Sequence, residues 1–174
     1  MEYGTFVGLS WGALFLSYVE GISRGNGLLV FLCLILCGAT ILLPFLLALR
    51  LNRKLLQIGQ KLNYWQGVLF AFSMFMYACI MNGIVVFAYF QFFDDGMLME
   101  QLTRMATQPE MVDAYKQLGM DEQYAQVTDM IREVDALSPF EKTLAVFNNN
   151  FVFSAIASFF VAIAAAWRGR SENS

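Results

Sequence analysis

Four long apolar runs, separated by polar stretches, dominate the pattern of this 174-residue chain. They span about residues 3–20, 27–49, 64–93 and 143–167. A bilayer core of roughly 30 Å needs about 20 helical residues to cross it, and each run is close to or above that length. The pattern predicts an all-α, polytopic bundle of four transmembrane helices.

The region between the third and fourth runs, residues 94–138, follows another pattern. Apolar residues recur there at spacings of three and four, as in Leu98, Leu102 and Met105. Such spacing is typical of short amphipathic helices, and we expect two or three of them. A helical insert this small would be only marginally stable alone, so we expect this cap to pack on the membrane helices.

Local sequence also predicts where helices begin and end. The stretch Ser138-Pro139-Phe140-Glu141 combines a capping serine, a proline at the first helical position and a glutamate three residues after the serine. This combination predicts a helix start. We expect the basic residues after position 49 to end the second helix and to open a basic loop over residues 50–63. The chain would then divide into residues 1–93 with three spans, the cap, and residues 139–174 with the last span and a short tail.

Composition and charge support a membrane protein and predict its orientation. Hydrophobic residues make up 58% of the chain and charged residues 14%, whereas a soluble domain is about one quarter charged. Basic residues gather in residues 50–63 and beyond position 167, while residues 94–143 hold eleven acidic and four basic residues, a net charge of −7. The positive-inside rule then predicts cytoplasmic N- and C-termini in a bacterial inner membrane, with the cap on the far side.

Small residues at four-residue spacing mark two candidate packing rows. On the first helix they are Gly4, Gly8 and Gly12, and on the fourth they are Ser154, Ser158 and Ala162. Small residues let helix backbones approach closely, which matters in lipid because apolar burial does not drive helices together there. We expect both rows to be helix-packing seams. The partner helix of each could belong to the same chain or to another.

Amides near the spans are the candidate polar sites. Asn82 lies near the middle of the third run, where an amide requires hydrogen-bond partners. An interhelical hydrogen bond is one interpretation, and a ligand contact in an intramembrane cavity is the other. Asn148, Asn149 and Asn150 are consecutive, so they point in three directions and either meet interfacial water or line a polar pocket under the cap.

The candidates for chemistry are few. The chain has no histidine, which removes the commonest general base and metal ligand. Its three cysteines, Cys33, Cys37 and Cys79, lie inside apolar runs, as buried packing residues do. No phosphate-binding loop, nucleophile motif or zinc motif is present, and we expect no cofactor, no metal and no enzymatic activity. A basic collar is the remaining candidate surface, and it comprises Arg50, Arg53, Lys54 and Lys61.

Nearly the whole chain resembles an uncharacterised family of small four-helix membrane proteins common in Bacteroidota and classed as a domain of unknown function. The resemblance rests on the Tyr3-Gly4…Gly8 start, the basic stretch after the second span, the Trp65-Gln66-Gly67 entry to the third, and the helical insert before the last span. The family implies a topology and supplies no catalytic residues. By analogy it also implies a membrane partner such as a polyprenyl-phosphate-dependent glycosyltransferase.

The function that we expect is that of a non-enzymatic membrane scaffold or accessory subunit. Membrane lipids and either another membrane protein or a second copy of the chain would be its partners, and nucleic acid would not. The alternative is a small lipid-binding protein or transporter with a polar cavity near the outer leaflet, formed around Asn82, Asn148, Asn149 and Asn150.

Overall fold

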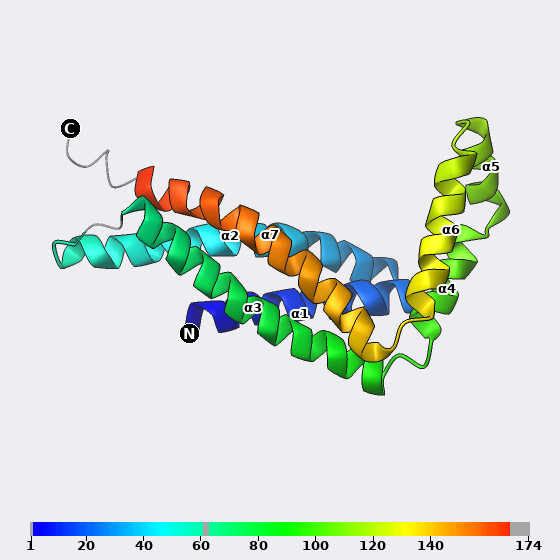
Figure 1. The fold of residues 1–174 in the computed structure, drawn as a ribbon, viewed down its shortest axis with the longest axis horizontal. Helices are drawn as coiled ribbons and strands as arrows, with labels where there is room; N and C mark the ends of the chain where they lie inside the picture. The colour runs from blue at the N-terminus through cyan, green and yellow to red at the C-terminus, as the bar shows by residue number, and fades with distance from the viewer. Residues whose placement is uncertain (1, 61–62, 168–174) are drawn as a thin grey trace.

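Seven α-helices form the part of the chain that the computed structural model describes, residues 2–60 and 63–167 (Figure 1). They are α1 (Glu2–Ser23), α2 (Gly27–Gln57), α3 (Tyr64–Phe92), α4 (Met97–Ala106), α5 (Pro109–Gln117), α6 (Asp121–Asp135) and α7 (Pro139–Trp167). Four of them, α1, α2, α3 and α7, are long and apolar enough to cross a membrane. The predicted all-α architecture with four candidate spans is confirmed.

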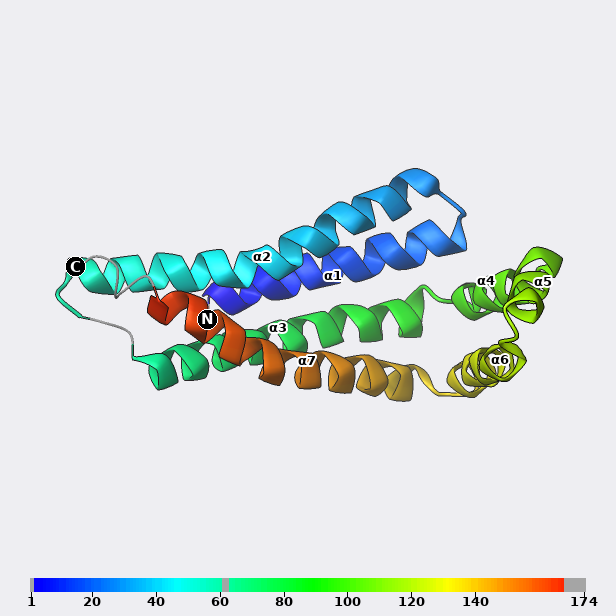
Figure 2. The ribbon, with the colours of Figure 1, turned by 90° about the horizontal axis from the view of Figure 1, so that it is seen from above.

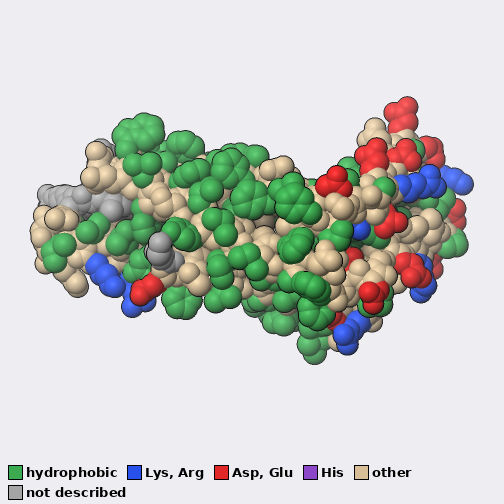
Figure 3. Space-filling view, turned by 60° about the horizontal axis from the view of Figure 1, so that its bottom comes forward, with side chains coloured by type: hydrophobic (Ala, Val, Ile, Leu, Met, Phe, Trp, Pro, Cys, Tyr) green, Lys and Arg blue, Asp and Glu red, His purple; other side chains and the backbone are tan. Residues whose placement is uncertain are grey.

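The four long helices lie side by side, with α3 in the most connected position. It packs along α7 on one side and along α1 on the other, and α2 is held mainly by α1 and α7 (Figures 1 and 2). A belt of hydrophobic side chains covers the face of the bundle seen in Figure 3, while acidic side chains gather at the cap, and all four long helices carry exposed large hydrophobic residues. The exposed apolar belt is what a lipid environment requires of a membrane protein.

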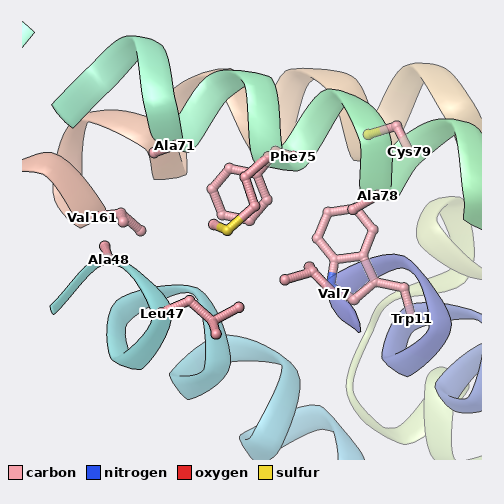
Figure 4. Packing of buried hydrophobic residues seen from close by; sticks show 10 residues of the cluster. Val7, Trp11, Leu47, Ala48, Ala71, Phe75, Ala78, Cys79 and Val161 are labelled. Carbon is pink, nitrogen blue, oxygen red and sulfur yellow. The ribbon is translucent and has the colours of Figure 1, made fainter. Parts of the chain in front are cut away.

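The interior of the bundle is built around aromatic and small residues of α1 and α3. The rings of Trp11 and Phe75 stack with their centroids 5.9 Å apart, and the two residues lie in one cluster with Val7 and Ala78 (Figure 4). Ala48 of α2 and a valine of α7 belong to the same cluster. One continuous core therefore joins all four long helices.

The end of the second helix differs from the prediction. The helix does not stop before Arg50, and α2 continues unbroken to Gln57, so the expected basic loop is largely helical. The basic residues end the apolar span without ending the helix, because lysine and arginine are good helix formers. The helix ends where Gly59 adopts φ +74°, the left-handed conformation that terminates many helices.

The predicted start of the fourth long helix is observed, and the third begins in a similar way. At α3, the backbone N–H of Asn63 donates to Gln66 Oε1 at 3.0 Å, which forms half of a capping box. At α7, the Ser138 backbone N–H donates to Glu141 Oε2 at 2.8 Å and the Glu141 N–H donates back to Ser138 Oγ. These reciprocal bonds satisfy backbone donors that lack partners inside the helix.

The cap consists of α4, α5 and α6, and it stands across one end of the bundle (Figure 1). Leu98 and Met99 of α4 are buried against Val19 of α1 and Val86 of α3. Half-buried Val134 of α6 packs against the same cluster. The cap therefore packs against the long helices, as expected for so small a unit.

Candidate functional site

The glycine row of α1 lies against α3. A Cβ atom placed on Gly8 would be 2.6 Å from Met81 Cβ, and one on Gly12 would be 3.1 Å from Val85 Cγ2. Gly4 is equally confined, with Tyr77 Cβ 2.5 Å from the position of an added Cβ. At Gly4 and Gly8 these distances leave no room for a side chain, and at Gly12 a small one fits only if Val85 shifts. In this structure the row therefore packs on a helix of the same chain, one of the two possibilities that the sequence leaves open.

The small residues of α7 are also inside the bundle. Ser154, Ser158 and Ala162 are all buried, and Ser154 Oγ lies 3.5 Å from Cys79 Sγ of α3. Each serine hydroxyl donates to a backbone carbonyl one turn earlier in α7, Ser158 Oγ to the Ser154 oxygen at 2.6 Å. Such local bonds satisfy a hydroxyl without a partner from outside the helix.

Asn82 occupies a different position from these hydroxyls. Its side chain, on α3, is 3% exposed, and its Oδ1 atom has no hydrogen-bond partner among the described residues. A helix interior offers spare lone pairs on its carbonyls but no spare N–H donors. Hydroxyl donors can therefore bond within their own helix, whereas an amide oxygen cannot. Asn82 Oδ1 is thus a buried acceptor without a donor among the described residues.

The structure does not bring the four candidate asparagines together. Asn148 and Asn149 are exposed on α7, and only Asn150 is half-buried toward the bundle. Consecutive residues of an α-helix are separated by 100°, which accounts for this divergence. Asn82 is enclosed within the bundle, so the predicted pocket formed by all four residues is not present among the described residues.

The basic collar gains a definite shape from the longer α2. Arg50, Arg53 and Lys54 are exposed and follow the i, i+3, i+4 spacing, so they share one face of the helix. Lys61, the fourth member predicted from the sequence, lies outside the described residues. The sequence reading missed this shared face, although Gly59 marks the true end of the helix.

The described residues contain no group of three or more histidine, cysteine, aspartate or glutamate side chains that could hold a metal ion. Cys33 and Cys37 lie on the poorly covered part of α2, and Cys79 is buried against Ser154. The features with definite geometry are therefore two internal seams, one buried amide and two charged ends.

Comparison with known proteins places the chain in one family. No curated protein and no solved structure matches it. The model of a family described as "Protein of unknown function (DUF4199)" matches residues 2–166. Nearly the whole chain is covered, four spans and cap included, and the resemblance seen in the sequence is confirmed. The chain belongs to the DUF4199 family of proteins of unknown function.

Proposed function

We propose that this protein is a non-enzymatic membrane scaffold or accessory subunit that engages another membrane protein through its two charged ends. One observation carries the proposal: the glycine row, which could have bound a second protein, is filled by α3 of the same chain. The charged surfaces available for recognition are the acidic cap and the collar of Arg50, Arg53 and Lys54. They lie at opposite ends of the bundle, so the protein could bind partners on both sides of a membrane.

The proposal includes an orientation, with the collar and both termini in the cytoplasm of a bacterium and the cap outside its inner membrane. The distribution of basic residues supports this orientation. Single cysteines introduced at Gln108 or Gln123 should be labelled from outside by a membrane-impermeant reagent, and a cysteine at Gln57 should not. Labelling of the Gln57 site from outside would show that the orientation is the reverse of the one proposed.

The scaffold role is tested by native co-purification of the full chain in mild detergent. Reversing the collar with Arg50→Glu, Arg53→Glu and Lys54→Glu together should remove a cytoplasmic-side partner, since it replaces three positive charges on one helix face with negative ones. The matched control reverses three exposed basic residues of the cap, with Arg104→Glu, Lys116→Glu and Arg132→Glu. Both variants must first show the orientation of the wild type.

The proposal fails if the wild type carries no stoichiometric protein partner, or if the collar variant keeps every partner. A polyprenyl-phosphate-dependent glycosyltransferase is the first partner to look for, because the family resemblance suggests it by analogy.

A lipid-binding or transport role is the second candidate, and the unpartnered Oδ1 of Asn82 is the observation that favours it. A lipid that co-purifies in fixed ratio without any protein partner would support this role. Loss of that lipid in an Asn82→Leu variant would assign it to the buried amide.

A further inference from the structure

The outer two helices of the cap carry apolar side chains that the chain itself does not cover. Neither α5 nor α6 has a buried residue. Met111 and Leu118, at the α5 end, are 43% and 72% exposed, and Val127 and Met130 of α6 are 39% and 62% exposed. We call these four side chains the cap ridge.

Helical spacing places the cap ridge on one side of the α5–α6 pair. Met111 and Leu118 are seven residues apart and share a face, as do Val127 and Met130 at a spacing of three. The rings of Tyr115 and Tyr124, 5.6 Å apart, mark where the two helices meet. Relative to that contact, the pair Met111 and Leu118 and the pair Val127 and Met130 are rotated about their helix axes toward the same side of the two helices. On a different face of α6, Thr128, Ile131 and Arg132 line a shallow groove together with residues of α4.

Charge is distributed unevenly about this ridge. At 100° per residue, Glu110 lies on the outer flank of α5, and Glu122 and Glu133 lie on the outer flank of α6. Helical spacing turns Lys116 and Arg132 away from the ridge, and Arg132 pairs with Asp129. The ridge is therefore an apolar strip with carboxylates along both edges and no basic side chain beside it, at the acidic end of the molecule (Figure 3).

We propose that the cap ridge binds a basic amphipathic helix of a partner protein, with its apolar stripe on the ridge and its lysines or arginines against the flanking glutamates. The inference rests on the proposed scaffold function and names the chemistry of the partner on the cap side. Methionine suits this role because its flexible, polarizable side chain adapts to varied apolar surfaces.

Charge selects this occupant over two others. A second copy of the cap would bring the same carboxylates against these, and like charges across an interface are repulsive. Anionic lipid head groups would be repelled in the same way. An amphipathic helix with basic edges would cover the apolar strip and place its positive charges against the flanking carboxylates.

The test uses the full-length protein in nanodiscs of zwitterionic lipid and a fluorescent synthetic helix of leucine and lysine. We expect this peptide to bind, its affinity to fall as salt is raised, and a matched leucine–glutamate peptide not to bind. The triple variant Glu110→Gln, Glu122→Gln, Glu133→Gln should weaken binding about tenfold, since an exposed ion pair contributes about twofold. Leu118→Ser with Met130→Ser should weaken it at least as much.

Matched controls separate the ridge from the general charge of the cap. Asp113→Asn, Asp121→Asn and Asp135→Asn remove the same number of charges from other faces and should leave affinity within about twofold of the wild type. Met97→Ser removes an exposed methionine of α4 that is not in the ridge and should also leave binding unchanged.

Equal loss in both charge variants, or equal binding of the acidic and basic peptides, overturns the proposal. It is likewise overturned if a dye on Met130→Cys, in a variant without the native cysteines, is quenched by brominated lipid, because the bilayer then covers the ridge. A wild type that co-purifies a partner through the collar but does not bind the basic peptide refutes this inference and leaves the scaffold function standing. If the wild type binds the peptide but co-purifies no native partner, the ridge is a binding surface and the proposed scaffold function fails.

Discussion

The bundle and the cap differ in what their small and apolar side chains touch. In the bundle, the glycines of α1 are pressed against α3 so tightly that an added Cβ would lie 2.6 Å from a neighbouring Cβ at Gly8. In the cap, α5 and α6 bury no residue at all. Close backbone packing holds membrane helices together, whereas an exposed apolar strip on a charged segment is a candidate binding surface. The comparison fits our proposal, in which the bundle provides stability and the charged ends, the cap among them, provide recognition.

Replacing a glycine of the row should produce the largest effect and would most easily break this assignment. Gly8→Ala should cost about 1–3 kcal/mol of stability, since its Cβ would overlap Met81 and press on the backbone of Ala78. Gly8→Leu should cost more and should separate α1 from α3. Gly38→Leu is the matched control, because nothing lies within 4 Å of a Cβ at Gly38. Thermal unfolding in detergent measures all three, and an unchanged melting temperature for Gly8→Leu would show that the row does not pack on α3.

The buried amide gives the next largest effect and sharpens the description of the bundle. Asn82→Asp should destabilise the protein by about 3 kcal/mol, the typical cost of a charge at the centre of a membrane helix. Asn82→Leu should change stability by no more than about 1 kcal/mol, because it removes an oxygen that has no partner in the chain. If Asn82→Leu instead proves strongly destabilising in the same unfolding assay, Oδ1 accepts a hydrogen bond and the amide is part of the packing.

Substitutions in the cap ridge should have the smallest effect. Leu118→Ser and Met130→Ser should each change stability by less than about 0.5 kcal/mol, since both side chains are mostly exposed. Leu98→Ser, at a buried position of the same cap, is the contrasting variant and should be clearly destabilising. Equal losses for the exposed and the buried positions would mean that the ridge is covered within the protein.

Much of the fold could be predicted because the relevant patterns are local. Apolar length predicts a span whatever its neighbours, and the capping residues around Ser138 and Glu141 act within one turn. The end of α2 was mispredicted because two limits were treated as one: charge ends the apolar span, and Gly59 ends the helix. The end of the apolar span depends on which side chains tolerate lipid, whereas the end of the helix depends on the backbone conformation at Gly59.

The candidate site was less predictable because its geometry depends on which helices meet. A small-residue row has the same sequence pattern whether its partner lies in the same chain or in another, and only the position of α3 distinguishes the two cases. Four asparagines could be grouped on polarity alone, yet Asn82 is enclosed while Asn148 and Asn149 are exposed. The cap ridge was missed because helical spacing shows an amphipathic face without showing whether anything covers it.

Cross-linking of α1 to α3 tests most directly whether the glycine row is used within the chain. A Cβ at Gly12 would lie 3.5 Å from Val85 Cβ, at the short end of the range of about 3.5–4.5 Å that disulfides span. The pair Gly12→Cys and Val85→Cys, in a variant without the native cysteines, should therefore oxidise to a disulfide within one chain. On a non-reducing gel the product should run as a monomer, and mixing it with a tagged copy should trap no tagged chain. A covalent dimer as the main product would show that the row joins two chains, and would contradict the assignment of recognition to the charged ends.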